Sequence, residues 1–109
     1  KGQMFPFGTS VQTIDMNDAT ITLTMDGLTG TKITSNLLFV DPNGNNEVLL
    51  LPPEAQCTAL PLLIANTGGE HIAVKEDGNS STIVTIEDNE VGFVFCNGTT
   101  WFGGTALQT

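Results

Sequence analysis

Few side chains in this sequence could perform chemistry. His71 is the only histidine, and the two cysteines, Cys57 and Cys96, are far apart along the chain. Nucleophilic catalysis needs a nucleophile beside a positioned base, and zinc sites need several histidine or cysteine ligands at close spacing. Because the chain has three lysines and no arginine, a clamp for an oxyanion or a phosphate would be hard to build. We therefore predict no catalytic residue, no metal site, no cofactor and no small-molecule substrate, and we expect that the chain is not an enzyme.

Three features leave more than one interpretation open. Cys57 and Cys96 each lie in an apolar neighbourhood, which is compatible with two buried thiols or with a bridge between them. The segment Asp41–Glu47 has the spaced oxygen atoms of a calcium loop, but Gly44 stands at its fourth position instead of the sixth, and a plain hairpin loop is the competing interpretation. Trp101, the only tryptophan, could close one end of the core, anchor an interface or stack against a sugar.

The charge balance excludes several kinds of partner. Twelve carboxylates face three lysines, and the formal net charge is −9. Phosphate binding requires clustered cations, so neither nucleic acid nor an anionic membrane is an expected partner. The longest apolar runs have the length of strands and fall short of the roughly 18 residues that a membrane span needs. The carboxylates instead predict a soluble acidic surface, or a partner whose surface is basic.

Hydrophobic periodicity predicts an all-β fold. No window places apolar residues at helical spacing over three turns, whereas Ala19–Met25 alternates threonines with apolar residues in the pattern of a half-buried strand. Short strands at intervals of about 8–12 residues are typical of a sandwich or a barrel. We predict a single-domain antiparallel β-sandwich or small barrel over residues 11–109, without tandem repeats. Its predicted hairpins join Val11–Asp15 with Ala19–Met25, Leu37–Val40 with Val48–Leu51, Leu60–Asn66 with His71–Lys75, and Thr82–Ile86 with Glu90–Cys96, before a last short strand over Thr100–Phe102.

An extended N-terminal arm is predicted over residues 1–10. Pro6 and two glycines bar regular structure in this segment. Met4, Phe5 and Phe7 are nevertheless too apolar to remain in water. We expect these three side chains to pack on this domain or on a neighbouring protein.

A series of short motifs extends over residues 28–104. The motifs are Leu28-Thr29, Leu37-Leu38-Phe39-Val40-Asp41, Leu51-Pro52, Ile64-Ala65-Asn66-Thr67-Gly68, Ile72-Ala73-Val74, Val91-Gly92-Phe93-Val94 and Asn97-Gly98-Thr99-Thr100-Trp101. In this order they resemble a β-rich module that recurs in structural proteins of tailed bacteriophages, chiefly head decoration (cement) proteins and fibre or tail modules.

The resemblance implies a structural virion protein, a head decoration protein on the outer capsid surface that binds the major capsid protein and stabilises the seams between its subunits. It also implies a homotrimer that needs no disulfide and that assembles in the reducing cytoplasm of the host. The alternative function is a tail or head fibre module that binds a host receptor or glycan through Trp101 and Asp41–Glu47. The expected interface residues are Met4, Phe5, Phe7, Trp101 and Phe102.

Deletion of residues 1–8 tests the predicted role of the arm. We expect the truncated chain to fold and to lose binding to capsids, because Met4, Phe5 and Phe7 would no longer enter a groove of the capsid. Co-sedimentation with capsids that lack the chain measures binding, and circular dichroism checks the fold. Unchanged occupancy of the truncated chain on the capsids would refute the prediction.

Overall fold

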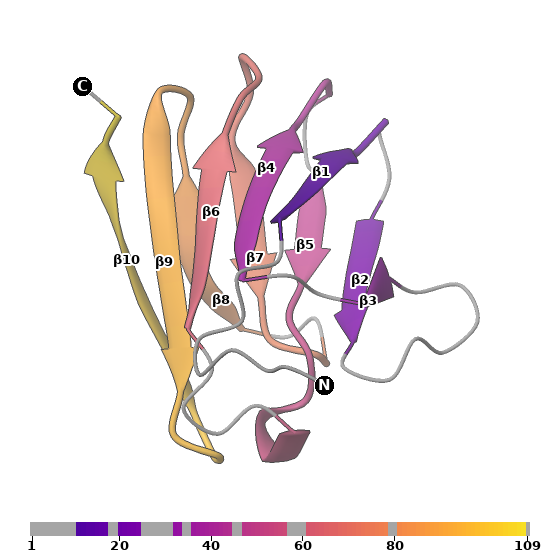
Figure 1. Cartoon of the computed structure of the whole chain (residues 1–109), viewed down its shortest axis with the longest axis vertical. Coiled ribbons are helices and arrows are strands. Elements are labelled where there is room, and N and C mark those ends of the chain that lie inside the picture. The colour runs from indigo at the N-terminus through magenta and orange to yellow at the C-terminus, as the bar shows by residue number, and fades with distance from the viewer. Residues whose placement is uncertain are drawn as a thin grey trace.

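The chain forms a sandwich of two β-sheets (Figure 1). The computed structural model describes residues 11–17, 20–24, 32–33 (backbone only), 36–44, 47–56, 61–78 and 81–108. The sheets do not close into a barrel, so the predicted all-β sandwich is confirmed and the barrel is not formed. The predicted arm and Cys57 lie outside the described residues.

Short connections separate most of the strands. The elements are β1 (Val11–Asp15), β2 (Thr20–Thr24), β3 (Lys32–Ile33), β4 (Leu37–Asp41), β5 (Val48–Leu50), the 3-10 turn η1 (Glu54–Gln56), β6 (Leu62–Asn66), β7 (Ile72–Lys75), β8 (Thr82–Ile86), β9 (Glu90–Cys96) and β10 (Trp101–Leu107). No helix within these described ranges has the length and apolar character needed to cross a membrane.

Each sheet combines parallel and antiparallel neighbours. The front sheet has the strand order β1-β4-β6-β9-β10, and the back sheet has the order β3-β2-β5-β7-β8. In the front sheet β1, β4 and β6 run parallel, whereas β9 is antiparallel to both β6 and β10. In the back sheet only β8 is antiparallel to its neighbour. The prediction of a purely antiparallel sandwich is therefore wrong, because both sheets are mixed.

The four predicted hairpins are also wrong. β1 and β2, β4 and β5, β6 and β7, and β8 and β9 follow one another along the chain, yet the members of each pair lie in opposite sheets. Alternation along a strand indicates that one face is buried, and it does not say whether the next strand lies beside the first or across the core. The hairpins that form join β7 to β8 and β9 to β10, and β10 continues to Leu107, beyond the predicted end at Phe102.

The crossings between sheets wind the chain into a coil as far as β7. Val11 lies opposite Leu37, and Leu37 lies opposite Leu63, so β1 and β4 each pair with a strand whose residues follow 26 positions later. The back strands β2, β5 and β7 stack in the same way. Parallel neighbours need a long crossover connection, and here a strand of the opposite sheet is part of that connection. The fold therefore contains a structural repeat that the sequence analysis did not predict.

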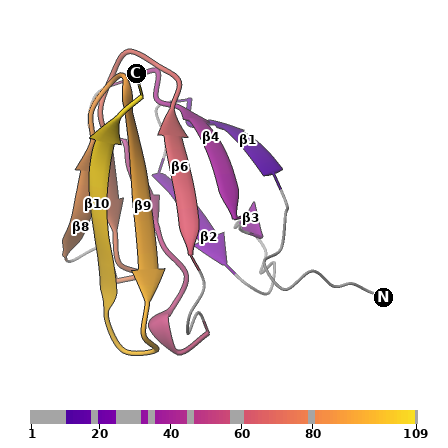
Figure 2. The same ribbon diagram turned by 60° about the vertical axis from the view of Figure 1, so that its left-hand side comes forward.

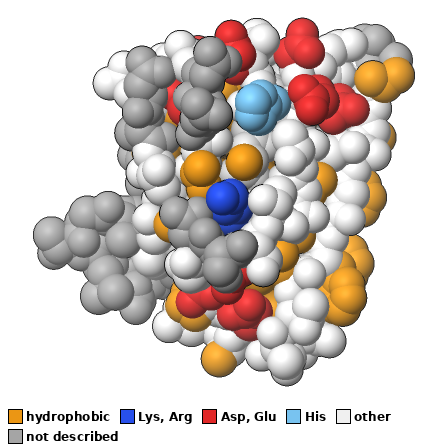
Figure 3. Space-filling view, turned by 180° about the vertical axis from the view of Figure 1, so that it is seen from behind, with side chains coloured by type: hydrophobic (Ala, Val, Ile, Leu, Met, Phe, Trp, Pro, Cys, Tyr) orange, Lys and Arg blue, Asp and Glu red, His pale blue; other side chains and the backbone are white. Residues whose placement is uncertain are grey.

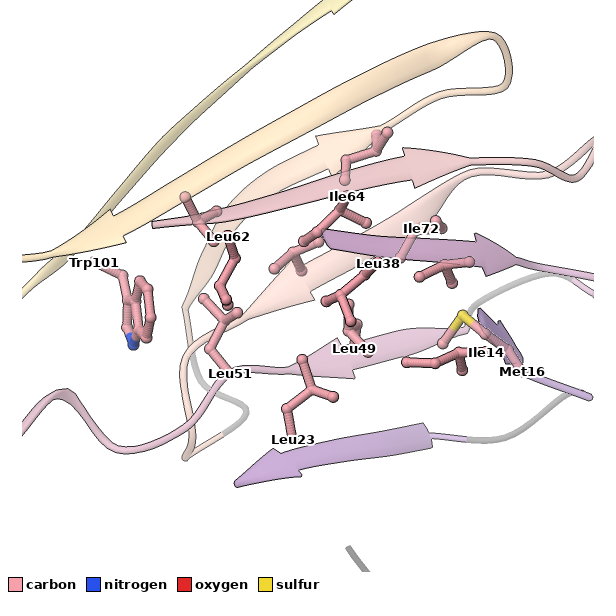
Figure 4. Packing of buried hydrophobic residues seen from close by; sticks show 14 of the residues in the cluster. Ile14, Met16, Leu23, Leu38, Leu49, Leu51, Leu62, Ile64, Ile72 and Trp101 are labelled. Carbon is pink, nitrogen blue, oxygen red and sulfur yellow. The ribbon is translucent and has the colours of Figure 1, made fainter. Parts of the chain in front are cut away.

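Alternate side chains of the two sheets fill the space between them (Figure 4). Leu38 and Ile64 extend inward from the front sheet, and Leu49 and Ile72 extend inward from the back sheet. All four side chains are fully buried, and burial of each contributes about 1.5–3 kcal/mol relative to exposure. The rest of this core consists of Ile14, Met16, Leu23, Val40, Leu51, Leu62, Val74, Ile86, Val94, Cys96 and Trp101.

The turns of the coil stack as closely as its strands. A Cβ atom added at Gly68, after β6, would lie 2.5 Å from Asp41 Oδ1 and 2.6 Å from the carbonyl oxygen of Pro42. Only glycine allows this close approach between backbones. Asn66 holds the same turn, because its Oδ1 accepts a 2.9 Å hydrogen bond from the Gly68 amide. The neighbouring Gly69 has no atom within 4 Å of the place where its Cβ would lie.

The two adjacent glycines provide a matched test of this stacking. We expect Gly68→Ala to lower the free energy of unfolding by about 1–3 kcal/mol, since the added methyl group would meet the backbone of the preceding coil. Gly69→Ala should change the free energy of unfolding by no more than about 0.5 kcal/mol. Urea denaturation followed by circular dichroism measures both values, and equal effects of the two substitutions would rule out close stacking at Gly68.

Candidate interaction surface

The outer face of the front sheet is apolar across its neighbouring strands. The register places Val11 of β1, Leu37 of β4, Leu63 of β6 and Phe93 of β9 side by side in one row. These residues alternate with the core residues of the same strands, so their side chains extend away from the core. We call this surface the apolar face, and its members are Val11, Leu37, Phe39, Leu63, Ala65, Val91, Phe93, Phe95 and Phe102.

Five large side chains of the apolar face are open to solvent. Val11 is 60% exposed and Leu63 is 49% exposed, while Phe93, Phe95 and Phe102 are 41%, 47% and 45% exposed. The rings of Phe95 and Phe102 stack with their centroids 5.7 Å apart and their planes at 25°. Single exposed apolar residues are ordinary, but a contiguous patch of them marks a site of contact with another molecule.

The ring of Phe93 lies against the backbone of β10. Gly104 is the cross-strand neighbour of Phe93, and a Cβ atom added at Gly104 would lie 2.8 Å from Phe93 Cζ. The ring therefore covers the glycine, a known way to stabilise glycine in a sheet. Because Phe95 and Phe102 are also stacked on each other, all three rings have contacts within the sheet before a partner binds, and such contacts reduce the entropy lost on binding.

The outer face of the back sheet has a different character. One row across this sheet consists of Thr20, Val48, Ala73 and Thr85, and the two threonines are exposed. Viewed from behind, the molecule shows mostly backbone and uncharged polar atoms, with hydrophobic atoms in small groups (Figure 3). Among the described residues, the exposed large apolar side chains thus all belong to the front sheet.

The carboxylates that Figure 3 shows in red, among the described residues, lie toward the two ends of the sandwich. Asp15 and Asp41 end β1 and β4, whereas Glu54, Glu76 and Asp77 follow β5 and β7 at the opposite end. The last three bring carboxylate oxygens within 4.8 Å of one another, and they are the only such group in the described part of the chain. Exposed acidic groups of this kind are common without a metal ion. The apolar face itself has no charged member.

The structure places Trp101 in the core. Its side chain is 4% exposed, and its Nε1 donates a 3.1 Å hydrogen bond to the carbonyl oxygen of Pro52. Of the three interpretations of Trp101, only closure of the core agrees with this burial, so the predicted contact of Trp101 with a partner is corrected. Phe102 does lie on the exposed apolar face. The remaining predicted interface residues lie outside the described residues: Met4, Phe5 and Phe7.

The structure separates Trp101 from the loop Asp41–Glu47. Trp101 begins β10 at one end of the front sheet, whereas Asp41 ends β4 at the opposite end. The loop connects the front sheet to the back sheet instead of closing a hairpin. Glu47 is 2% exposed and accepts a 3.0 Å hydrogen bond from the Asn43 amide. The predicted glycan-binding tip, which would combine the loop with Trp101, is therefore not formed.

His71 and Cys96 are also far apart. His71 directly precedes β7 and is half-buried, whereas Cys96 ends β9 at the other end of the sandwich. Cys96 is an unbridged thiol, 2% exposed, and its Sγ lies 3.6 Å from the carbonyl oxygen of Glu54. The fold therefore does not bring the histidine and this cysteine together.

Sequence reasoning missed Leu63, Phe93 and Phe95 as contact residues. A signal was present in Val91–Cys96, where apolar side chains stand at odd-numbered and at even-numbered positions, so that both faces of the strand are apolar. Strands that are apolar on both faces are typical of sheets covered on both sides. The core covers one side of β9, and no described element covers the other. This uncovered side is the candidate binding site.

Comparisons with known proteins yielded no relative of the chain. No family model, no curated protein and no solved structure matched it. Function must therefore be inferred from the exposed surface and from the motifs in the sequence.

The burial of Trp101 makes a direct prediction. Trp101→Phe should lower the free energy of unfolding by about 1–3 kcal/mol, because it leaves the buried Pro52 carbonyl without its donor. Phe102→Leu, at the neighbouring exposed position, should have an effect of about 0.5 kcal/mol or less. Urea denaturation measures both changes. Tryptophan emission typical of a solvent-exposed indole in the native wild-type chain would contradict the core position.

Proposed function

We propose that the chain is a structural virion protein, a head decoration protein that binds the major capsid protein through the apolar face. The observation that carries this proposal is a contiguous apolar surface that, among the described residues, is present on the front sheet and not on the back sheet. The order of motifs that resembles phage virion modules supplies the identity of the partner. The binding mode requires contact area and no reactive group.

Burial of the apolar face provides the driving force for attachment. If an aromatic side chain presents about 200 Å², the exposed parts of Phe93, Phe95 and Phe102 amount to roughly 270 Å². At about 25 cal/mol per Å² their burial contributes roughly 7 kcal/mol before the cost of association is subtracted. A modest affinity of each copy suffices on a capsid, because many copies and many sites act together.

The distribution of charge favours the same orientation. Asp15 and Asp41 share the outward side of the front sheet but lie at the ends of β1 and β4, beyond the apolar face. The apolar face can therefore be covered while both carboxylates stay in water, which avoids the expensive desolvation of a charge. The acidic groups at the two ends of the sandwich would remain at the rim of such a contact, where water still reaches them. Polar rims around an apolar centre are usual in protein interfaces.

The alternative of a receptor-binding fibre module receives no comparable support. It relied on Trp101 as an exposed platform, and this side chain is buried. The loop Asp41–Glu47 lies at the other end of the front sheet. Attachment to a virion surface is therefore the function that we put forward.

Lysine substitutions on the two sheets distinguish the faces. Phe95→Lys puts a charge into the apolar face, whereas Thr85→Lys puts the same charge on an exposed position of the back sheet. With capsids that lack the chain, we expect Phe95→Lys to weaken binding at least about tenfold, because burial of a lysine would oppose docking. Thr85→Lys should bind like the wild type.

The assay is co-sedimentation of purified chain with these capsids over a range of chain concentrations. Thermal unfolding of both variants controls for loss of the fold. Equal binding of a folded Phe95→Lys variant and the wild type would eliminate the apolar face as the attachment surface.

A further inference from the structure

The outer edge of β10 is an open row of hydrogen-bonding groups. At the two ends of the β9–β10 hairpin, Asn97 N donates to Thr100 O (3.3 Å) and Gln108 N donates to Asn89 O (3.0 Å). Hydrogen-bonded pairs alternate with non-bonded pairs in an antiparallel ladder. The residues that bond to β9 are therefore the even-numbered ones between these two ends. The backbone groups of the others point away from β9, and these residues are Trp101, Gly103, Thr105 and Leu107.

The other edges of the two sheets are blunted. β3 has two residues, and β8 has a register shift opposite Val74/Lys75. β1 has five residues and ends in the carboxylate of Asp15. Short strands, irregularities and charges are the usual means by which proteins prevent pairing at an edge.

β10 has none of these protections. Its seven residues, Trp101–Leu107, include neither a charged residue nor a proline. It lies at the margin of the front sheet, beside β9 (Figure 2). Within the described residues no hydrogen bond joins its outer edge to another segment. An uncharged edge of this length is a template for a further strand.

We propose that the outer edge of β10 binds β10 of a second copy of the chain in antiparallel orientation. A two-fold axis at Gly104 pairs the strand with itself and closes the assembly at two chains. In this register Trp101 lies opposite Leu107 of the second copy, and Gly103 lies opposite its Thr105. All four residues with outward backbone groups thereby gain partners.

The exposure of Leu107 agrees with this register. Leu107 is 70% exposed, more than the other large apolar side chains of the described residues. It belongs to the outward-bonding set of β10, at the end remote from Trp101. Pairing places it beside the tryptophan end of the second β10, where the added strand covers it.

Charge limits where a second copy can pair. Each chain has a net charge of −9, so two chains repel one another over most of their surface. The edge formed by Trp101–Leu107 is uncharged, so two copies can pair there without opposing carboxylates across the contact. The two apolar faces then join, with Phe102 beside Ala106 of the second copy.

This inference replaces the homotrimer that the resemblance implies with a two-fold dimer, and it does not depend on attachment to a capsid.

A substitution at Thr105 tests pairing at the outer edge of β10 separately from the bonds to β9. Thr105→Pro removes an outward N–H without removing a bond to β9, and proline is tolerated on edge strands. Thr105→Val changes the side chain and keeps the N–H.

The experiment is sedimentation equilibrium of the full chain, with its mass of 11.5 kDa, over a range of concentrations. The wild type and Thr105→Val are expected at twice this mass, and Thr105→Pro at the mass of one chain. A wild type that stays single at every concentration, a mass of three chains, or a folded Thr105→Pro variant that still dimerises would overturn the proposal.

Amide hydrogen exchange provides a second readout that needs no variant. In the wild type, the amides of Gly103, Thr105 and Leu107 should exchange more slowly in concentrated than in dilute protein, because pairing covers them. Exchange at these three amides that is independent of concentration, in a sample that associates, would place the contact elsewhere and overturn the proposal. This test remains decisive if Thr105→Pro fails to fold.

Discussion

The parallel pairing of β1 with β4 and of β4 with β6, each one coil later in the chain, is the constraint on which the rest of the structure depends. It forces the chain to cross between the sheets after β1, β4 and β6, and it aligns equivalent positions at intervals of 26 residues. Side chains at alternate positions therefore fall into rows on each side of the front sheet. The inner rows make the core, and the outer rows make the apolar face. The turn at Gly68 lies closely against the preceding coil at Asp41 and Pro42, as the strands of successive coils lie against one another.

The outer faces of the two sheets differ in polarity because their outward rows consist of different residue types. On the back sheet, exposed Thr20 and Thr85 stand at the two ends of an outward row whose middle members are Val48 and Ala73, so water can hydrogen-bond to that surface. On the front sheet, Leu63 and Phe93 are direct neighbours, and Phe95 stacks on Phe102. The described carboxylates lie toward the ends of the sandwich, so their negative charge does not interrupt the apolar rows. Among the described residues, a molecule arranged in this way has one outward surface suited to burial against protein.

Local patterns in the sequence predicted much of the secondary structure and little of the topology. The alternation in Ala19–Met25 identified a strand, and β2 occupies its centre. Pairing could not be read from the same alternation, since a strand buries its apolar side equally well beside its successor or across from it. In the sequence, the coil is visible as a weak repeat, in which Ile14-Asp15 corresponds to Val40-Asp41. The repeat is weak because neighbouring positions in a row of the sheet need similar polarity and not identical residues. The prediction of Trp101 as an interface residue was wrong because an aromatic residue at the end of a strand is equally suited to a core and to an interface. Phe93 and Phe95 could be recognised as exposed contact residues only once the structure showed which side of β9 faces the core.

The most direct test of the central claim is hydroxyl-radical footprinting of the chain, free in solution and bound to the capsid. The free chain is expected to be oxidised at Phe93, Phe95 and Phe102, which are all more than two-fifths exposed. Protection of these rings in the bound chain, with unchanged labelling of the back sheet at Thr85, is the result that attachment through the apolar face requires. Rings that remain as reactive as in the free chain, with protection on the back sheet instead, would contradict the claim.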